Sequence, residues 1–262
     1  MHIGIIGALT EEITLIQEQI KNSCIQEKAK RKYFSGTLYN VTTTVVASGC
    51  GKVAAAIAAS TLISEFKVDN IIFIGTAGGI APFLNIGDIV ISTKLYHHDM
   101  DTRPIFPRYE IPLTGKSYFE ADYHMQQLSF AAATQVVKKD LSNITSNTGS
   151  KYFINTIPNV YLGLIGSGDC FVNNTQRKND LIMDTLAVEM EGAAVAQVCD
   201  EHNLPFVVIR IISDKADHSA AIDFLAFLHD VASHFSNEII KTLFQKSNFS
   251  EVYQMENFTI LS

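Results

Sequence analysis

Short apolar runs alternate with helix-patterned segments along most of the chain, and this alternation limits the possible folds more than any other feature. The strand-like runs cover residues 3–6, 41–47, 70–74, 88–93, 160–165 and 205–212, and the helical patterns cover residues 11–20, 52–66, 123–140, 191–202 and 224–244. Such alternation predicts a largely parallel sheet with helices on both faces. Residues 33–38 and 41–47, joined at Tyr39-Asn40, predict an antiparallel hairpin instead. We therefore predict a single-domain α/β fold with a mixed central β-sheet.

Composition and charge narrow the class of protein. The chain has 262 residues, 47% of them hydrophobic, and no Pro-, Ser- or Gly-rich stretch divides it, so one large core is expected. The formal net charge is −7, and the basic run at residues 28–32 is interpreted as a solvated turn, so we predict no nucleic-acid or anionic-membrane partner. No apolar run approaches the roughly 18 residues needed to span a bilayer.

The cysteines and the least regular segments give further expectations. Cys24, Cys50, Cys170 and Cys199 are far apart and show no metal-finger spacing, so we expect reduced, mostly buried thiols in a cytoplasmic protein. Residues 96–118 contain three prolines and predict a long loop that acts as a lid or a subunit contact. The sequence does not decide whether the tail at residues 246–262 packs on the body.

Carboxylates stand where two apolar runs end. Residues 187–191 end in Glu189-Met190-Glu191, and residues 211–214 end in Ser213-Asp214. In open α/β sheets, ligands bind beyond the carboxyl ends of the strands, so these acids predict a substrate site. Glu12 follows the first strand and is expected to face the same cleft, although capping of the next helix also accounts for one acid there.

Two glycine-rich segments also follow strands. Residues 75–79 lack the spacing of a dinucleotide fold, and residues 51–53 lack that of a phosphate loop, so neither NAD nor ATP is supported. Residues 75–79 either form a tight turn or let the backbone approach a ligand closely. In residues 166–173, Phe171 is either a core residue or an aromatic face for a planar ligand. Four loops with three acids and one aromatic predict a pocket for a polar ring system.

Two polar clusters have simpler interpretations than metal binding. His97 and His98 are adjacent, and on a strand they point to opposite faces, so we predict no metal site. Asp217 and His218 follow Asp214, and for Asp217 capping of the next helix is the preferred reading.

Taken together, these motifs resemble the 5′-methylthioadenosine/S-adenosylhomocysteine nucleosidases of the nucleoside phosphorylase superfamily. The resemblance covers residues 1–245, taken as the catalytic domain, and leaves the tail at 246–262 unplaced. The matching motifs are residues 3–8 with Glu12, 48–55, 75–79, 87–90, 167–169, 188–191 and 212–214.

The resemblance implies hydrolysis of an N-glycosidic bond with release of adenine and no cofactor. Asp214 would be the general acid that protonates adenine N7, held by Ser213, and Glu12 would activate water. The remaining implied roles are water positioning for Thr76 and Arg210, ribose binding for Glu191, sugar packing for Met190, adenine stacking for Phe171 and recognition of the adenine edge by the backbone of Val172. It also implies a homodimer in which residues 97–118 lie near the partner's pocket.

The residue types suit this chemistry independently of the resemblance. Cleavage of an N-glycosidic bond leaves positive charge on the sugar and negative charge on the base, so an acid on one side and a carboxylate with water on the other lower the barrier. Asp214 must then be kept protonated near neutral pH by burial or by its neighbours.

The sequence departs from the family pattern at two places, and two alternative functions are also considered. Thr76 replaces the serine usual in the family, and residues 101–109 differ from the commoner family sequence, so substrates are not ranked; Arg103 and Arg108 either bind a carboxylate-bearing tail or are surface charges. One alternative is a phosphorylase of the same fold, which acids in residues 7–12 disfavour because they would repel phosphate. The other is a non-catalytic nucleoside-binding protein, which predicts loss of the acid or the base.

Overall fold

The computed structural model describes residues 1–139, 157–172, 178, 181–216 and 227–246. In this part of the chain the strands are β1 (His2–Gly7), β2 (Lys21–Lys28), β3 (Arg31–Leu38), β4 (Val41–Ala47), β5 (Asn70–Gly79), β6 (Ile89–His97), β7 (Phe119–Glu120), β8 (Val160–Ser167), β9 (Thr185–Glu189) and β10 (Phe206–Asp214). The helices are α1 (Thr10–Glu18), α2 (Lys52–Ser64), α3 (Tyr123–Lys139), α6 (Gly192–Glu201), the π-helix η2 (Leu228–Ala232) and α8 (Ser233–Lys246).

The strands form one mixed sheet with an open half and a closed half. The open half runs β2-β3-β4-β1-β5, and the other half runs β5-β10-β6-β8-β9 and pairs back onto β5. The pairs β1–β4, β1–β5, β5–β10, β6–β8 and β8–β9 are parallel, whereas β6–β10 and β5–β9 are antiparallel. The predicted single-domain mixed sheet is confirmed. Its closure into a ring was not predicted, because periodicity identifies strands but not their partners.

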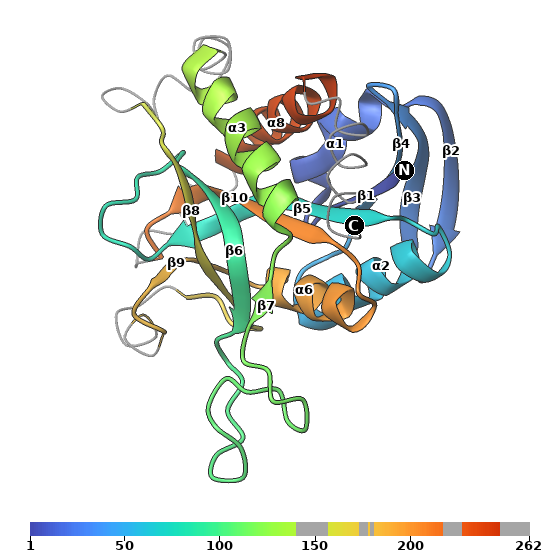
Figure 1. The fold of residues 1–262 in the computed structure, drawn as a ribbon. Helices are drawn as coiled ribbons and strands as arrows, with labels where there is room; N and C mark the ends of the chain where they lie inside the picture. The colour runs from blue at the N-terminus through green and yellow to red at the C-terminus, as the bar shows by residue number, and fades with distance from the viewer. Residues whose placement is uncertain (140–156, 173–177, 179–180, 217–226, 247–262) are drawn as a thin grey trace, which may run out of the picture.

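Helices cover both faces of the sheet, as predicted (Figure 1). α1, α3 and α8 pack on one face, where Ile13, Val136 and Phe235 belong to one apolar cluster with β-strand residues. α2 and α6 pack on the other face, where Ala58 and Ala193 belong to a second cluster. The small alanines let these two helices approach the strands closely.

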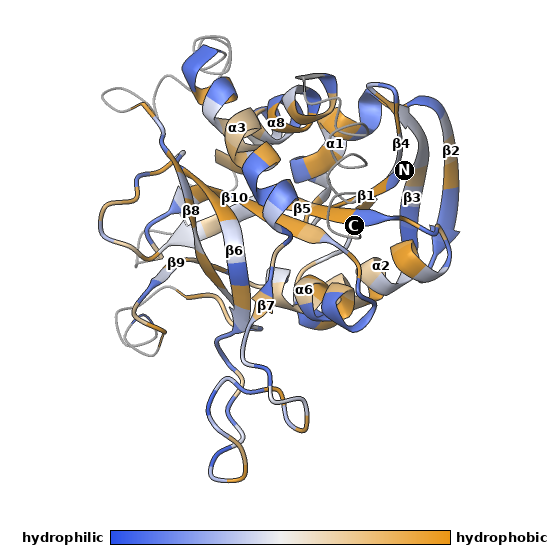
Figure 2. Ribbon diagram, in the orientation of Figure 1, coloured by the Kyte–Doolittle hydropathy of each residue, from blue (hydrophilic) through white to orange (hydrophobic). Residues whose placement is uncertain are grey.

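Burial follows the position of each strand in the sheet. All nine residues of β10 are buried because β5 and β6 flank it, and the central strands are accordingly apolar in Figure 2. The edge strand β2 is exposed along nearly all of its length. It was not predicted, because its polar sequence lacks apolar alternation. The run at residues 28–32, predicted to be a solvated turn, is a turn only at Ala29 and Lys30, with φ of 45° and 61°, because its other residues belong to β2 and β3.

Two expectations about local structure were wrong. β5 was expected to end at Ile74 but continues through the glycine-rich segment to Gly79, because that segment pairs with β10 and β9. The cysteines are free but not mostly buried, since only Cys199 is buried. Cys24 is exposed on the polar edge strand β2 and Cys50 in the turn that enters α2. Asp217, His218 and residues 247–262 lie outside the described residues.

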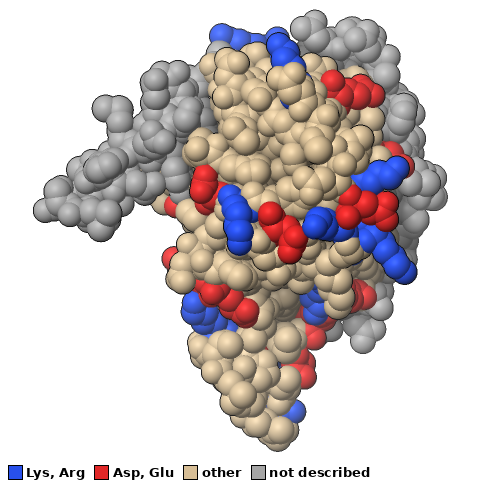
Figure 3. All heavy atoms as spheres, turned by 90° about the vertical axis from the view of Figure 1, so that its right-hand side faces the viewer, with Lys and Arg blue, Asp and Glu red and all other residues tan. Residues whose placement is uncertain are grey.

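The surface on the β2 side of the molecule mixes both signs of charge (Figure 3). Lys28 of β2 forms an ion pair with Glu65 beyond α2, at 3.1 Å. None of the described helices has the length and apolar character needed to cross a membrane.

Candidate active site

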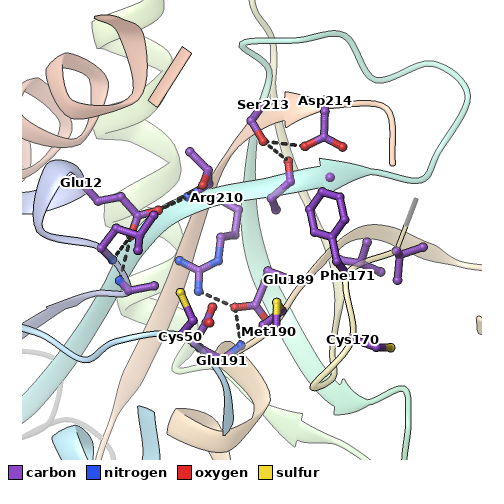
Figure 4. Close-up of a pocket in the computed structure, with 17 residues that line it drawn as sticks. Glu12, Cys50, Cys170, Phe171, Glu189, Met190, Glu191, Arg210, Ser213 and Asp214 are labelled. Carbon is purple, nitrogen blue, oxygen red and sulfur yellow. Dashed lines mark hydrogen bonds and ion pairs between the residues drawn. The ribbon is translucent and has the colours of Figure 1, made fainter. Parts of the chain in front are cut away.

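One pocket lies where the carboxyl ends of β1, β5, β8, β9 and β10 converge. Its empty volume, including the solvent-filled mouth, is about 790 Å³. All nine residues predicted for the site, from Glu12 to Asp214, line this pocket, and Figure 4 shows Glu12 and Asp214 on different sides of it with Arg210 between them. Ring closure of β5, β10, β6, β8 and β9 brings strand ends together that an open sheet would separate.

Glu12 is a buried carboxylate held by four donors. Its Oε2 accepts hydrogen bonds from the backbone N–H groups of Ala8 (2.8 Å) and Leu9 (3.1 Å), at the start of α1. Its Oε1 accepts from the backbone N–H (2.8 Å) and the hydroxyl (3.1 Å) of Thr76. An ionised carboxylate has enough lone pairs to accept all four hydrogen bonds. The capping interpretation of Glu12 and its place in the pocket therefore both hold.

Glycines of β5 make room for the two buried acids. A Cβ at Gly75 would lie 2.5 Å from Glu12 Oε1, and a Cβ at Gly78 would lie 3.1 Å from Asp214 Oδ1. The glycine-rich segment is therefore not a turn. It is a strand end whose missing side chains let two carboxylates approach the backbone.

Asp214 ends β10 and is 6% exposed. Its Oδ1 accepts from the backbone N–H of Ala216 (2.7 Å), and Ser213 Oγ lies 2.8 Å from its Oδ2. Ser213 Oγ also lies 3.3 Å from the carbonyl oxygen of Ala77. Since one hydroxyl has one proton, a Ser213 that donates to Ala77 leaves its oxygen able to accept from a protonated Asp214. The site therefore accommodates either protonation state of this acid.

Glu191 is the third buried acid of the pocket. It precedes α6, and its Oε1 accepts a hydrogen bond from the backbone N–H of Gly51 at 2.8 Å. Burial, followed by repulsion from Glu189, raises the pKa of Glu191 to about 8. Arg210 and the Gly51 N–H act in the opposite direction but do not offset this rise.

Arg210 is fully buried and pairs with a residue that sequence reasoning left without a role. Its Nη2 lies 2.5 Å from Oε2 of Glu189, and its guanidinium lies over the ring of Phe73, 3.9 Å from the centroid. Glu189 and Glu191 are two positions apart, and such spacing at a strand end could have indicated that both acids face one cleft.

Three predicted residues of the pocket are apolar. Phe171 is 43% exposed and lies beside Asp214 in Figure 4, so its ring is available to a ligand. Val172 is buried against Val188 and Ala216. Met190 also lines the pocket. The structure thus brings these side chains together, while their individual roles stay predictions.

Neither histidine of the 97–98 pair belongs to a metal cluster among the described residues, where no group of three suitable ligands occurs. Both histidines are buried, and burial lowers the pKa of each. His97 Nε2 lies 3.1 Å from Oε1 of Gln197, which fixes its ring against α6.

Comparison with known proteins places the chain in a superfamily of enzymes. Residues 2–245 match the sequence model of the phosphorylase superfamily. A 5′-methylthioadenosine/S-adenosylhomocysteine nucleosidase from Anoxybacillus flavithermus is 36% identical over 252 residues, which cover 95% of this chain and 100% of the relative.

Solved structures agree with this relationship. The nucleosidase of the same name from Neisseria meningitidis, in complex with methylthio-immucillin-A, superposes with a TM-score of 0.81 at 31% identity, covering 93% of this chain and 98% of that one. A futalosine hydrolase of Helicobacter pylori gives a TM-score of 0.79 at 30% identity, covering 93% and 97%. The chain belongs to the 5′-methylthioadenosine/S-adenosylhomocysteine nucleosidase family.

Proposed function

We propose that this protein hydrolyses the N-glycosidic bond of 5′-methylthioadenosine and S-adenosylhomocysteine and releases adenine. The observation that carries the proposal is the placement of two buried acids, Glu12 and Asp214, on different sides of one pocket. The names of the relatives and the inhibitor-bound neighbour support the same reaction.

In the proposed reaction the two acids work in opposite directions. Glu12, held as a hydrogen-bond acceptor by Thr76 and the start of α1, takes the proton of the attacking water. Asp214 donates its proton to N7 of adenine, so the departing base leaves neutral. Ser213 holds the carboxyl of Asp214 in place, and Phe171 offers its exposed ring to the purine.

The sugar is held between the acids. Glu191 accepts hydrogen bonds from the ribose hydroxyls, and Met190 packs against the ring. Because the developing sugar cation lies in the pocket that Glu12 lines, the negative charge of this carboxylate stabilises it.

Water suits this pocket better than phosphate does. Arg210 is the only basic side chain among the described lining residues, and it already pairs with Glu189. A phosphate dianion would meet the Glu12 carboxylate with no unpaired basic side chain among these lining residues, which disfavours the phosphorylase alternative. The retained acids equally disfavour a non-catalytic binding protein.

We also propose a homodimer in which residues 97–118 reach the partner's pocket. This segment projects from the body between β6 and β7 (Figure 1), and Ile105 and Leu113 on it are 79% and 90% exposed. Apolar side chains so exposed on a projecting loop indicate a surface that another chain covers.

Arg103 pairs with Asp101 at 2.6 Å, which supports its role as a surface charge. The cytoplasmic location and the boundary of the tail at residue 246 stay predictions.

The roles of the two acids can be tested with near-isosteric variants. We expect Asp214→Asn and Glu12→Gln each to lower kcat for adenine release by at least about 10³-fold, because each removes one of the two proton transfers. Adenine release from 5′-methylthioadenosine, S-adenosylhomocysteine and futalosine gives the rates and ranks the substrates. Normal turnover by either variant contradicts its assigned role.

A further inference from the structure

Glu189 is a buried acid of the pocket that the proposed reaction does not use directly. Glu189 is the last residue of β9, and its side chain is 3% exposed. It accepts hydrogen bonds from the backbone N–H of Gly192 (2.7 Å) and of Glu191 (3.1 Å) and from the hydroxyl of Ser167. With the ion pair to Arg210, donors from β8, β10 and the start of α6 hold this carboxylate in one geometry.

The ion pair also fixes the direction of Arg210. Nη2 contacts Glu189 while the guanidinium stacks on Phe73. Arg210 is 1% exposed, and its Nε and Nη1 find no acceptor among the described residues. Figure 4 places the guanidinium within the pocket, between Glu12 and Glu191. Two buried donors are therefore available to a ligand or to water in the pocket.

The pocket holds more negative than positive charge. Glu12, Glu189 and Glu191 share it with one guanidinium, and Arg210 neutralises Glu189. Glu191 is consequently the acid that retains a proton at neutral pH. Glu189 from β9, Glu12 from α1, Arg210 from β10 and the Cys50 thiol before α2 are the titratable or charged groups that face it.

We propose that Glu189 is a positioning residue for the hydrolysis. It holds Arg210 with Nε and Nη1 toward the reacting water, and it prevents the same guanidinium from pairing with Glu191, which stays available to the ribose hydroxyls. This inference rests on the proposed function, because it assigns the free donors of Arg210 to the water that Glu12 activates.

The test replaces Glu189 by glutamine, which keeps the shape and removes the charge. We expect Glu189→Gln to lower kcat by about tenfold or more, with a smaller change in KM, because Arg210 is no longer held. Arg210 can then pair with Glu191, and the repulsion from Glu189 is gone. The pKa of Glu191 therefore falls. We expect kcat/KM to rise as Glu191 ionises and accepts from the ribose hydroxyls, so in the variant this rise should occur at a pH lower by about one unit or more.

Two companion variants separate positioning from general stability. Glu189→Asp keeps the charge on a shorter side chain, so it should lower kcat while the pH profile keeps its wild-type position. Asp88→Asn is the matched control, since Asp88 is also fully buried, is held by the N–H groups of Asn85 and Asn159 at 2.7 Å each, and does not line the pocket. It should leave both kcat and the pH profile unchanged.

The outcomes distinguish this inference from the proposed function. A ¹³C NMR titration of the glutamate carboxyls, assigned with Glu191→Gln, measures the pKa of Glu191 without any turnover. A wild-type protein that releases no adenine contradicts the proposed function alone. An unchanged kcat and an unchanged Glu191 titration in Glu189→Gln overturn the positioning role. If that variant does not fold, a wild-type kcat in Glu189→Asp overturns it.

Discussion

At the scale of single residues, the pocket is organised by which buried acid has which partner. Glu12 is satisfied by four donors, Glu189 by a guanidinium, and Glu191 by one backbone N–H in the structure. Three glutamates thus differ in charge and hydrogen bonding because their surroundings differ. The acids and their clustering were predictable from their places after apolar runs. The pairing of Arg210 with Glu189 was not, because it depends on side-chain packing across two strands.

The raised pKa of Glu191 makes stability depend on pH in a defined direction. The pKa of Glu191 is about 8 in the folded protein and roughly 4.3 in an unfolded chain. Between these two pH values the Glu191 carboxyl is therefore protonated in the native state and ionised in the unfolded state. The contribution of Glu191 to stability is therefore greatest at acidic pH and is lost as pH rises to about 8.

We accordingly expect Glu191→Gln to become more stable than the wild type as the solution becomes alkaline. The gain in the free energy of unfolding should be on the order of 1 to 3 kcal/mol near pH 8.5 and small near pH 5. Denaturant unfolding of both proteins at the two pH values measures it. A constant difference between the proteins at both pH values contradicts the assigned direction. Substrate binding should be weaker in the variant throughout.

At the scale of elements, a polar cluster joins three segments around the pocket. Lys52 Nζ at the start of α2 lies 2.7 Å from Oδ1 of Asp99, which follows β6. The backbone N–H of Asp169, which follows β8, donates to Oδ2 of Asp99 at 2.9 Å, and Oδ1 of Asp169 accepts from the backbone N–H of Lys52 at 2.8 Å. The adjacent Gly51 N–H contacts Glu191. The cluster thus connects the segment after β8, which carries Phe171, to the backbone that holds Glu191.

Removing Asp99 should loosen both sides of the pocket. We expect Asp99→Ala to raise KM by about fivefold, equivalent to about 1 kcal/mol for the hydrogen bonds lost, with little change in stability because the pair is partly exposed. Glu65→Ala is the control, since it breaks the ion pair to Lys28 beyond the other end of α2. Steady-state kinetics give the KM of both variants. An equal KM in both contradicts a role of the Asp99 cluster in holding the pocket together.

The elements themselves were predictable to different degrees. Apolar runs located β1, β4, β5, β8 and β10, and the hairpin of β3 and β4 followed from Tyr39-Asn40. β2 was missed because its exposed, polar sequence has no period, and only pairing with β3 makes it a strand. The strand character of residues 75–79 was missed because glycine disfavours strands, and here it is explained by the acids that lie against it.

At the scale of the whole molecule, closure of the strand ring brings together the strand ends that form the pocket, and the segment at residues 97–118 projects from the body between β6 and β7 (Figure 1). The sequence predicted helices on both faces and a site at the strand ends. It could not predict that β9 and β10 both pair with β5, since partner choice depends on contacts between residues far apart in the chain.

Charge on the projecting segment should separate the proposed dimer. We expect the double change Ile105→Asp and Leu113→Asp to give a monomer, because two apolar side chains in the interface become charged. Light scattering after gel filtration measures the mass. Ile25→Asp, an exposed apolar position on β2, is the control and should keep the wild-type mass. An unchanged mass in the double variant places the interface elsewhere.

The central claim is that water, activated by Glu12, attacks the sugar. It is tested most directly by mass spectrometry of the sugar product formed from 5′-methylthioadenosine in H₂¹⁸O, with and without phosphate. We predict free methylthioribose with one ¹⁸O atom, formed at the same rate in both conditions, together with adenine. A sugar 1-phosphate, or a reaction that requires phosphate, would contradict the account.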